Sequence, residues 1–403
     1  MRPFTSTISL DEARRRLEAH VRPIARTERV RLADAAGRVV AADVTAPIDV
    51  PPFSRSAMDG YAVVAADTAG ASRSTPRRLR VIDRIFTGQV SRATVAAGMC
   101  AEIATGAPLP NGADAVVMVE ETSRSGDSVD VFAAADAGQN VGRRGADMQA
   151  GQGVVSNLDV LTPSRVGALA AVGCDGVEVY ARPGVAILPT GDEVILPGEP
   201  LPPGHIYDVN QFTLGALVSA HGGVPQTRRA ARDTVEALVA ALDACAKEAD
   251  VIVFSGGSSV GDRDLVVDAI AAAGGEMIFH GIAVRPGKPT AFAIVGGTPL
   301  FGMPGNPTSC LSNAYILLVP FLRAIARLPP HEPRTIAAPL GRRIASAVNR
   351  HQFYTVRLRD GVAYPAFKGS GDITSLSQAD GYIEIPADQD VVEAGTIVDV
   401  KLF

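Results

Sequence analysis

The sequence contains few residues of the kinds that carry redox, metal or nucleophilic chemistry. Tryptophan is absent, and only four cysteines occur among 403 residues: Cys100, Cys174, Cys245 and Cys310. They form no CxxC pair, which argues against a zinc site or a disulfide framework and favours reduced, buried thiols. Histidine is also scarce, at six. Neither a Ser-His-Asp nor a Cys-His set is apparent, so the sequence gives no sign of a catalytic triad.

Long hydrophobic runs and an excess of basic charge are missing as well. Residues Met1 to Arg16 have no apolar core flanked by a cleavage site, and no window approaches the roughly 20 apolar residues of a membrane span. The net charge is −5, and no run of Lys and Arg forms a stripe for nucleic acid. We therefore expect a soluble, cytoplasmic protein that binds neither a membrane nor nucleic acid.

The composition is that of a large globular protein. Hydrophobic residues make up 47% of the chain and charged residues 20%, so several cores can be buried and wholesale disorder is excluded. The 40 glycines and 28 prolines indicate many turns. The length corresponds to two to four domains.

The first part of the chain predicts two helical segments separated by a small β-rich domain. Ser9-Leu-Asp-Glu12 is a capping box that opens a helix through about His20. Pro51-Pro52 marks a junction, and Thr162-Pro163 starts a helix that ends at Ala171. Between these points short apolar strands alternate with turns, for example at 79–85, 115–119 and 129–133.

From Gly184 onward the pattern alternates between strands and helices. Strands are expected at 185–188, 224–230, 251–255, 277–284, 291–295 and 300–302, and helices at 210–220, about 233–248, 263–273 and 307–327. Asn210 is expected to cap the first of these helices. The alternation favours a mostly parallel sheet with helices on both faces. Residues 336–403 show short strands with little helix, so a small C-terminal β domain is expected.

Four polar segments follow predicted strands of this α/β region. The strongest is Ser255-Gly-Gly-Ser-Ser-Val-Gly-Asp-Arg-Asp264, where glycines and a helix N-terminus favour an anion. It is neither GxGxxG nor a Walker P-loop, so neither a dinucleotide fold nor a Walker NTPase is indicated. The others are Thr190-Gly-Asp-Glu193, Arg285-Pro-Gly-Lys288 and Pro304-Gly-Asn-Pro307. Their shared sheet edge predicts a phosphate or pterin site, with plain tight turns as the alternative.

Two acidic residues and three further loops complete the candidate site. Asp262 and Asp264 either cap the helix or hold a divalent cation that bridges protein to phosphate, and the spacing alone does not decide. Outside the α/β region, polar glycine-containing loops of the kind that carry function occur at Ser56-Ala-Met-Asp-Gly-Tyr-Ala62, Thr105-Gly-Ala-Pro108 and Gln139–Asp147.

These segments occur in the order seen in the molybdopterin molybdenumtransferases. The chain resembles that family, which includes bacterial enzymes and the corresponding part of gephyrin-type proteins, over nearly its whole length. The resemblance implies an α/β multidomain fold. Its parts are a central molybdopterin-binding α/β domain with a mostly parallel sheet, a discontinuous helical segment, a β-rich insertion and a small C-terminal β domain. The implied domain boundaries are 1–46 with 151–176, 47–150, 177–330 and 331–403.

The resemblance also implies the activity and the residues that perform it. The protein would insert molybdate into adenylylated molybdopterin, release AMP, and need Mg²⁺ or a similar ion. The implied catalytic residues are Asp59, Asp147, Glu193, Asp233 and Asp264, with Asp264 and Glu193 also holding the metal. The implied substrate-binding residues are Thr105, Thr190, Ser255, Gly256, Gly257, Ser258, Gly261, Arg285, Lys288, Pro304 and Asn306.

The family resemblance further implies a homodimer with a shared site. Asp59 and Asp147 would come from one chain, and Glu193, Asp233, Asp264, Arg285 and Lys288 from the other. Transient contacts with molybdopterin adenylyltransferase and with apo-molybdoenzymes are implied as well.

Two positions depart from some relatives, and two other functions compete with molybdate insertion. Gly281 stands where some relatives carry a lysine, and Gly142 where some carry a third arginine, so each removes an anion contact. One alternative is a molybdopterin adenylyltransferase, which needs only a domain like 177–330. The loops with Asp59 and Asp147 argue against it. The other is a non-enzymatic, gephyrin-like scaffold, against which the absence of long linkers argues.

Overall fold

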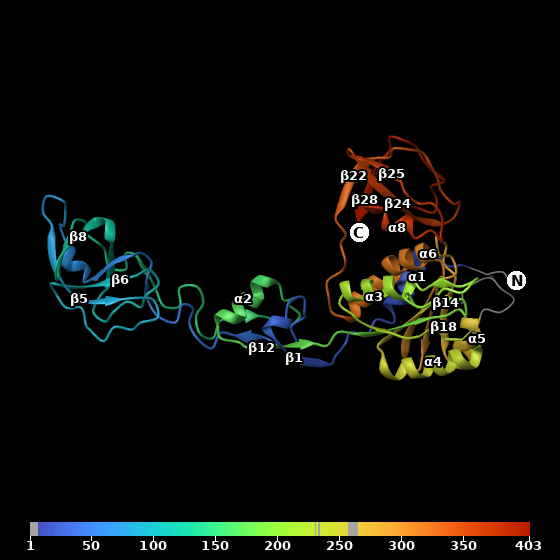
Figure 1. Ribbon diagram of the computed structural model, residues 1–403, viewed down its shortest axis with the longest axis horizontal. Coiled ribbons are helices and arrows are strands. Elements are labelled where there is room, and N and C mark those ends of the chain that lie inside the picture. The colour runs from blue at the N-terminus through green and yellow to red at the C-terminus, as the bar shows by residue number, and fades with distance from the viewer. Residues whose placement is uncertain (1–6, 230, 233, 257–264) are drawn as a thin grey trace. The chain divides into compact units, whose positions relative to one another are not determined.

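The computed structural model describes residues 7–229, 231–232, 234–256 and 265–403, which divide into two compact units (Figure 1). Unit 1 comprises Met1–Glu28 and Tyr180–Phe403, and unit 2 comprises Arg29–Val179. The chain passes between the units within two strands that pair with each other, β1 (Thr27–Arg31) and β12 (Gly176–Tyr180).

Unit 1 contains a six-stranded sheet in the order β16 (Val224–Thr227), β13 (Gly184–Pro189), β17 (Val251–Ser255), β21 (Thr298–Met303), β20 (Ala291–Val295) and β18 (Glu276–His280). Neighbours from β16 to β21 pair in parallel, whereas β20 is antiparallel to both of its neighbours. Every residue of β13 and β17 is buried, as expected for central strands covered on both faces. The predicted mostly parallel sheet is confirmed.

Helices cover both faces of this sheet. One face carries α1 (Leu10–Glu18), α3 (Asn210–Ala220), α6 (Pro307–Asn313) and α7 (Val319–Ile325), and the other carries α4 (Val235–Glu248) and α5 (Leu265–Ala272) (Figure 1). Successive strand residues point to opposite faces. Accordingly Val185 and Ile187 pack with the first set of helices, and Ala186 and Leu188 with the second.

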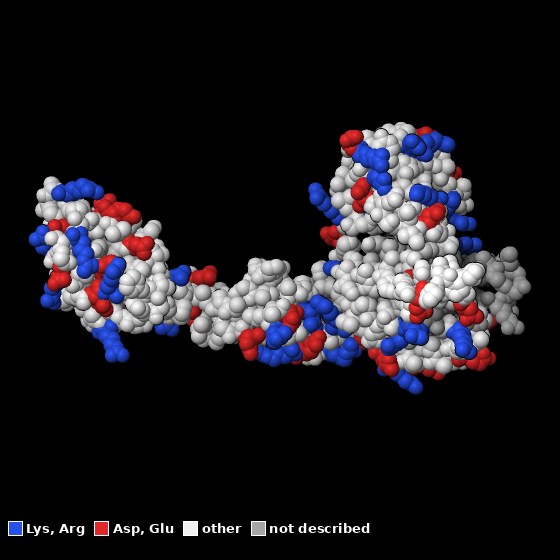
Figure 2. Space-filling model, viewed as in Figure 1, with Lys and Arg blue, Asp and Glu red and all other residues white. Residues whose placement is uncertain are grey.

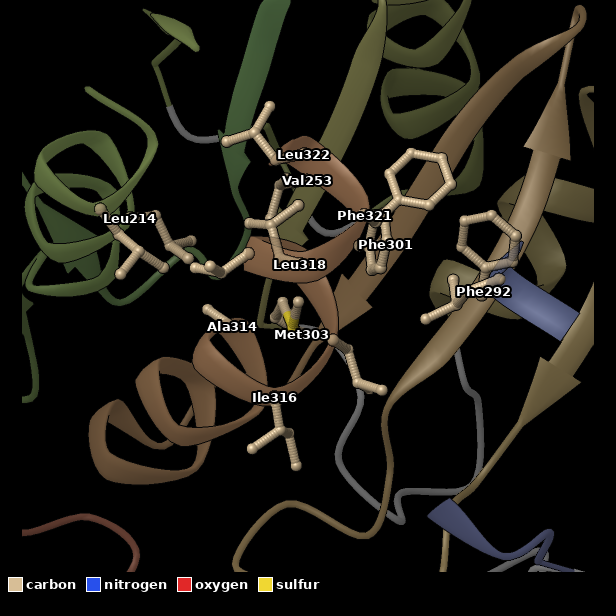
Figure 3. Close-up of a cluster of buried hydrophobic side chains, with 14 of the residues drawn as sticks. Leu214, Val253, Phe292, Phe301, Met303, Ala314, Ile316, Leu318, Phe321 and Leu322 are labelled. Carbon is tan, nitrogen blue, oxygen red and sulfur yellow. The ribbon is translucent and has the colours of Figure 1, made fainter. Parts of the chain in front are cut away.

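The larger of the two cores gathers aromatic rings from the sheet and from α7. The ring centroid of Phe292 lies 4.9 Å from that of Phe301 and 5.8 Å from that of Phe321, in tilted and edge-on arrangements (Figure 3). Such pairs add to the free energy of area burial. The core fixes the strands whose carboxyl ends carry the candidate site.

A continuous helical segment runs through this core. It comprises α6, a π-helical stretch at Ala314–Leu318, and α7. By length and composition alone, Pro307–Ile325 is long and apolar enough to cross a membrane, which the sequence reading did not anticipate. However, 72% of its apolar window is buried inside the protein, so it is the core helix of the α/β domain.

Short polar side chains cap the N-termini of α1 and α3, and the cap of α3 differs from the predicted one. Ser9 caps α1, as expected, by accepting a hydrogen bond from the Glu12 backbone N–H at 3.2 Å. The expectation that Asn210 caps α3 is wrong. Asp208 does so, because its Oδ1 accepts from the Gln211 N–H at 3.0 Å. Asn210 is the first residue of α3, and its Nδ2 instead donates to the Gly305 carbonyl at 2.8 Å.

A second sheet forms the C-terminal β domain of unit 1. Its order is β19 (Val284–Arg285), β24 (His351–Arg359), β26 (Gly381–Ile385), β28 (Ile397–Leu402) and β22 (Thr335–Pro339), with β25 (Val362–Pro365) paired to β24. Smaller elements of unit 1 are β14 (Val194–Ile195) with β15 (Ile206–Tyr207), β23 (Ile344–Ala345) with β27 (Val391–Val392), and α8 (Thr374–Ser377).

The single strand expected at 277–284 is wrong. β18 ends at His280, and the backbone N–H groups of Gly281 and Ile282 bond to the carbonyls of Thr290 and Lys288. The chain then joins the C-terminal sheet as β19, where Arg285 lies opposite Gln352.

Unit 2 contains a β-rich part and a helical part. The β-rich sheet has the order β7 (Ala115–Met118), β4 (Gly60–Val63), β6 (Met99–Ile103), β5 (Arg77–Ile85), β9 (Ser128–Val131) and β8 (Thr122–Ser125). The helical part combines α2 (Pro163–Ala171), β2 (Val44–Thr45) and β11 (Gly153–Val155) around a core of Val40, Leu161, Leu169 and Val177. Short elements are β3 (Arg55–Ser56) with β10 (Val141–Gly142), and 3-10 turns at Leu32–Asp34, Ala65–Thr68 and Val119–Glu121.

The predicted fold class is confirmed, from the discontinuous helical segment to the small C-terminal β domain. The domain boundaries at 46/47, 150/151, 176/177 and 330/331 stay a prediction. On the face of each unit visible in Figure 2, basic and acidic side chains are interspersed. The ion pairs of unit 2 include Arg78 with Asp130.

Candidate active site

A cavity of about 1260 Å³ opens at the carboxyl edge of the α/β sheet in unit 1. β13 ends at Pro189, β17 at Ser255 and β21 at Met303. Because these strands are parallel, the turns that follow them lie together at one edge of the sheet. The cavity wall contains these residues proposed from the sequence: Thr190, Glu193, Ser255, Gly256, Arg285, Lys288, Pro304 and Asn306.

Two of these turns touch without a side chain between them. A Cβ atom on Gly305 would lie 3.4 Å from the Gly256 Cα, and one on Gly256 would lie 2.6 Å from the Thr190 carbonyl oxygen. Gly256 also has a φ of 107°, which side chains with a Cβ rarely adopt. Its N–H bonds to the Met303 carbonyl, and the Thr190 N–H bonds to the Ser255 carbonyl. Backbone therefore lines this part of the cavity and leaves room for a ligand.

Two cations lie at the end of β19 and in the loop that follows it. Arg285 is exposed and forms no ion pair with a described residue, and Lys288 is half-buried. Both residues line the cavity. A wall with this charge suits a phosphate or another oxyanion, because guanidinium and ammonium groups form charge-assisted hydrogen bonds.

A buried asparagine on α6 fixes the same loop. Asn313 is fully buried, and its Nδ2 donates to the Gly287 carbonyl at 2.8 Å and to Thr290 Oγ1. A Cβ on Gly287 would overlap this amide group. The position of Lys288 therefore depends on a residue 25 positions away, which sequence reasoning did not identify.

The C-terminal β domain contributes a further wall that the sequence analysis missed. Arg350, Phe367 and the segment 368–371 line the cavity. Asn306 Nδ2 donates to Ser370 Oγ at 3.0 Å, and the Thr308 N–H donates to the Ser370 carbonyl at 3.1 Å, so this segment is tied to the turn before α6. The sequence signal was present: Lys368-Gly-Ser-Gly371 combines a cation with flanking glycines.

Asp208 is another lining residue that the sequence reading overlooked. It is 6% exposed, and burial raises the pKa of its carboxyl above the ordinary value, while hydrogen bonds from the backbone N–H groups of Gln211 and Asn210 oppose that rise. Asp208-Val-Asn210 lies between a strand and a helix, like the segments that were identified.

Three predicted loops meet within unit 2. Asp59 Oδ1 accepts a hydrogen bond from the Thr105 N–H at 2.8 Å. The Ala57 N–H donates to the Asn140 carbonyl, which belongs to the Gln139–Asp147 segment. Asp147 has an exposed side chain, and its backbone N–H bonds to the Val50 carbonyl. Asp59 and Thr105 thus form one local group, with a carboxylate oxygen held by a backbone donor.

Some of the predicted residues lie outside the described part of the chain: Asp233, Gly257, Ser258, Gly261 and Asp264. Within the described ranges, no group of three or more His, Cys, Asp or Glu side chains is arranged to hold a metal ion. Glu193 is the one predicted metal ligand whose position is described, and its carboxylate is exposed at the cavity wall.

Three family models match successive regions of the chain. The MoeA N-terminal region (domain I and II) matches residues 8–173, a probable molybdopterin binding domain matches residues 186–324, and the MoeA C-terminal region (domain IV) matches residues 337–403. The last two regions together contain every described residue that lines the cavity, and the N-terminal region contains none of them.

Curated proteins and solved structures are similar over the full length of the chain. Molybdopterin molybdenumtransferase 2 of Mycobacterium tuberculosis is 37% identical, covering 96% of this chain and 99% of the relative. Molybdopterin molybdenumtransferase of Bacillus subtilis is 32% identical, covering 98% and 94%. The molybdopterin biosynthesis MoeA protein of Pyrococcus horikoshii superimposes with a TM-score of 0.86 at 37% identity, covering 98% and 99%.

Proposed function

We propose that this chain, which belongs to the molybdopterin molybdenumtransferase family, inserts molybdate into adenylylated molybdopterin in the cavity of unit 1. It is a transferase of molybdenum-cofactor biosynthesis, the activity for which its full-length relatives are named. The alternatives, an adenylyltransferase and a non-enzymatic scaffold, do not match those names.

The observation that carries the proposal is the composition of the cavity wall. Arg285 and Lys288 provide positive charge, and the Gly256 and Gly305 turns provide backbone at close range. Adenylylated molybdopterin contains a phosphoanhydride, and molybdate is an oxyanion. Both would gain charge-assisted hydrogen bonds from this wall.

The reaction mainly requires that the substrates are positioned and that negative charge is stabilised. Water attacks the phosphoanhydride between the pterin phosphate and the adenylyl group, so that this bond breaks and AMP leaves. The two thiol sulfurs of molybdopterin then form bonds to molybdenum, one molybdate oxygen leaves as water with the two thiol protons, and molybdenum keeps its oxidation state. Negative charge grows on the phosphate oxygens as the bond breaks. Arg285 and Lys288 would stabilise that charge, and the rigid proline-flanked turns would hold the substrate in place.

Mg²⁺ would be held by Glu193 together with Asp264. Carboxylate oxygens are the ligands that Mg²⁺ prefers, and the exposed Glu193 carboxylate at the cavity wall fits that role. When bound, the ion would neutralise charge on phosphate oxygens. Asp59, Asp147 and Asp233 complete the proposed set of catalytic carboxylates.

The working site would be shared within a homodimer. All described residues that line the cavity belong to unit 1, whereas Asp59, Thr105 and Asp147 belong to unit 2. Two subunits related by two-fold symmetry can each supply one half of two sites. The site would then combine the cavity of one chain with the Asp59–Thr105 group of the other.

The cellular setting and the domain division are part of the same proposal. The four cysteines of the chain are free thiols, and burial raises the pKa of the Cys100 thiol to about 12, which suits a reducing cytoplasm. The proposed domains are 1–46 with 151–176, 47–150, 177–330 and 331–403. The clusters around Leu238, Val356 and Ile103 each lie within one of them, whereas α1 packs into the core of unit 1. Molybdopterin adenylyltransferase and apo-molybdoenzymes would be transient partners.

Release of AMP from adenylylated molybdopterin, with and without molybdate, tests the proposal. We expect molybdate-dependent release by the wild type and a rate at least about tenfold lower for Arg285→Ala, because hydrogen bonds to charged groups contribute about 1.5–3 kcal/mol. Arg359→Ala removes an exposed cation outside the cavity wall and should retain the wild-type rate. AMP release that does not depend on molybdate would contradict the proposal, and so would an Arg285→Ala variant that releases AMP as fast as the control.

A further inference from the structure

Three buried oxygen atoms in residues of the cavity wall have no hydrogen-bond partner among the described residues. They are Thr190 Oγ1, Asp208 Oδ2 and Asn210 Oδ1. The three residues are only 3%, 6% and 8% exposed. Native proteins satisfy nearly all buried polar atoms, so three orphaned acceptors in one cavity wall point to a ligand that brings donors.

A chain of short contacts brings the three residues together. Thr190 Oγ1 lies 2.9 Å from the place where a Cβ on Gly256 would stand, and Gly256 touches Gly305. The Gly305 carbonyl in turn accepts from Asn210 Nδ2, and Asn210 follows Asp208 at the start of α3. The three residues that carry the orphaned oxygens therefore lie near the glycine contact at the carboxyl edge of the sheet.

The remaining polar atoms of these side chains are already engaged, which defines what the free atoms can do. Asp208 Oδ1 accepts from the Gln211 N–H, so Oδ2 is the free oxygen of that carboxyl group. Asn210 Nδ2 donates to Gly305, so its Oδ1 can only accept. The group thus offers acceptors and, apart from the Thr190 hydroxyl, no donor. It suits the N–H edge of a ligand and disfavours a phosphate or molybdate.

We propose that Asp208, Asn210 and Thr190 form the subsite for the pterin ring, with Asp208 Oδ2 accepting from its N3–H and 2-amino edge. The inference rests on the proposed function and adds the location of the heterocycle. A pterin carries two adjacent N–H donors on that edge. The adenine of the same substrate carries its 6-amino group beside ring nitrogens that accept, and these would face the acceptors of the protein.

Burial and ligand binding act on Asp208 in opposite directions. Desolvation raises the pKa of its carboxyl, with backbone N–H bonds opposing the rise. Donors from a bound pterin would favour the ionised form further, because hydrogen bonds to a carboxylate stabilise its charge. The subsite is therefore suited to neutral N–H groups, whereas Arg285 and Lys288 would serve the anionic part of the substrate.

Asp208→Asn is the sharpest variant for testing the subsite. Asparagine caps helices as well as aspartate does, so Oδ1 can still accept from the Gln211 N–H and α3 should form. The change replaces the free oxygen with an NH₂ donor that would face the N–H edge of the pterin. Thr190→Val is a second, nearly isosteric variant. It removes an oxygen that bonds no described residue, so it should fold even if Asp208→Asn does not.

Binding to the full-length protein would be measured by isothermal titration calorimetry with three probes. 6-Hydroxymethylpterin carries the 2-amino group, 6-hydroxymethyllumazine carries an oxygen in its place, and AMP carries the adenine. Asp243→Asn makes the same chemical change at an exposed position of α4 and serves as the matched control.

We expect wild type and Asp243→Asn to bind the pterin at least about tenfold more tightly than the lumazine. Asp208→Asn should lose about tenfold in pterin affinity and most of that preference, Thr190→Val should lose severalfold, and AMP affinity should not change. If Asp208→Asn lowers the affinity for AMP alone, the adenine binds here and the inference is wrong. It is also wrong if the variant loses affinity equally for all three probes, or loses affinity for none of them. A wild type that releases AMP normally yet does not discriminate the two rings refutes only the subsite. A wild type without molybdate-dependent AMP release refutes the proposed function itself.

Discussion

Glu384 illustrates how a single side chain holds the sheet that carries Arg285. Its side chain is 19% exposed, Oε2 lies 3.0 Å from His351 Nε2, and Oε1 lies 2.7 Å from Lys401 Nζ. The hydrogen bond from His351 and the Lys401 ammonium lower the pKa of this carboxyl from 4.5 to about 2. His351 lies opposite Val284 in the pairing of β24 with β19, so this ion pair stabilises the strand beside the anion-binding loop.

The lowered pKa predicts a defined acid dependence. A carboxyl whose folded pKa lies below its unfolded value contributes stability that is complete above the unfolded pKa, here 4.5, and is lost as the pH falls toward 2. We expect Glu384→Gln to unfold at a lower temperature than wild type at pH 7, a loss of about 3 kcal/mol at most. The difference should shrink between pH 4.5 and 2. Thermal unfolding of both proteins across that range measures it.

The control for this prediction is Glu393→Gln. Glu393 pairs with Arg343, but its side chain is 67% exposed, so solvent screens the pair and little stability is at stake. A gap between wild type and Glu384→Gln that stays constant from pH 7 to pH 2 would contradict the proposed role of the Glu384 charge.

At the scale of residues, sequence reasoning found the groups that follow strands and missed those that reach the cavity from elsewhere. Thr190, Ser255 and Arg285 were identifiable because glycine and proline punctuate their segments. Asn313 was not, since its role depends on a contact with Gly287 that exists only in the folded chain. Hydrogen bonding to a distant backbone leaves no local pattern in a sequence.

At the scale of elements, α6 acts on the cavity through the loop that it supports. Asn313 donates to the Gly287 carbonyl and to Thr290, and both acceptors belong to the loop that carries Lys288. Because the amide occupies the space that a side chain at Gly287 would need, loop and helix fit each other. Asn313 therefore supports the loop of a cation although it does not itself line the cavity.

We expect Asn313→Ala to weaken molybdate binding more than it slows the reaction at saturation. Removing the amide frees the loop, so the molybdate concentration for half-maximal AMP release should rise severalfold while the maximal rate changes less. Stability should also fall by about 1–3 kcal/mol, because two hydrogen bonds of a buried amide are lost. Molybdate titrations of AMP release, together with thermal unfolding, separate the two effects.

The neighbouring Ser312 provides the matched control for this variant. Ser312 is fully buried on the same helix, and its Oγ bonds no described residue. Ser312→Ala should leave the molybdate dependence unchanged. If Asn313→Ala lowers only the unfolding temperature and keeps the wild-type molybdate dependence, α6 supports the fold and does not position Lys288.

Element boundaries show where a sequence pattern stops being sufficient. The alternation of strands and helices was readable because the central strands β13 and β17 are apolar up to Ser255, the last residue of β17. The division of 277–284 into β18 and β19 was not, because Val284 and Arg285 pair with His351 and Gln352, which lie far along the chain. Pairing between distant strands depends on register, and apolar periodicity does not encode it.

At the scale of the whole molecule, the proposed catalytic residues are divided between the two units. The cavity lies in unit 1, whereas Asp59 and Thr105 meet in unit 2. The order of motifs along the sequence suggested the division, but a shared site is a property of an assembly. It therefore needs a test that depends on how chains combine.

Mixing two variants with damaged sites provides that test. Arg285→Ala damages the cavity, and Asp59→Ala damages the group in unit 2. If each site takes Arg285 from one chain and Asp59 from its partner, every site in either homodimer carries one lesion. In a mixed dimer one site collects both lesions, and the other receives Arg285 from the Asp59→Ala chain and Asp59 from the Arg285→Ala chain, so it is intact.

Random pairing makes about half of the dimers mixed, and half of their sites work, so AMP release should recover to about a quarter of the wild-type rate. The two variants would be co-expressed with different tags, and native mass spectrometry would confirm that mixed dimers form. Mixing Arg285→Ala with Lys288→Ala is the control: both lesions lie in unit 1, and each site, which takes its cavity from a single chain, stays damaged. If mixed dimers form and neither combination regains activity, each site is completed within one chain, and the assignment of Asp59 to the partner's cavity is wrong.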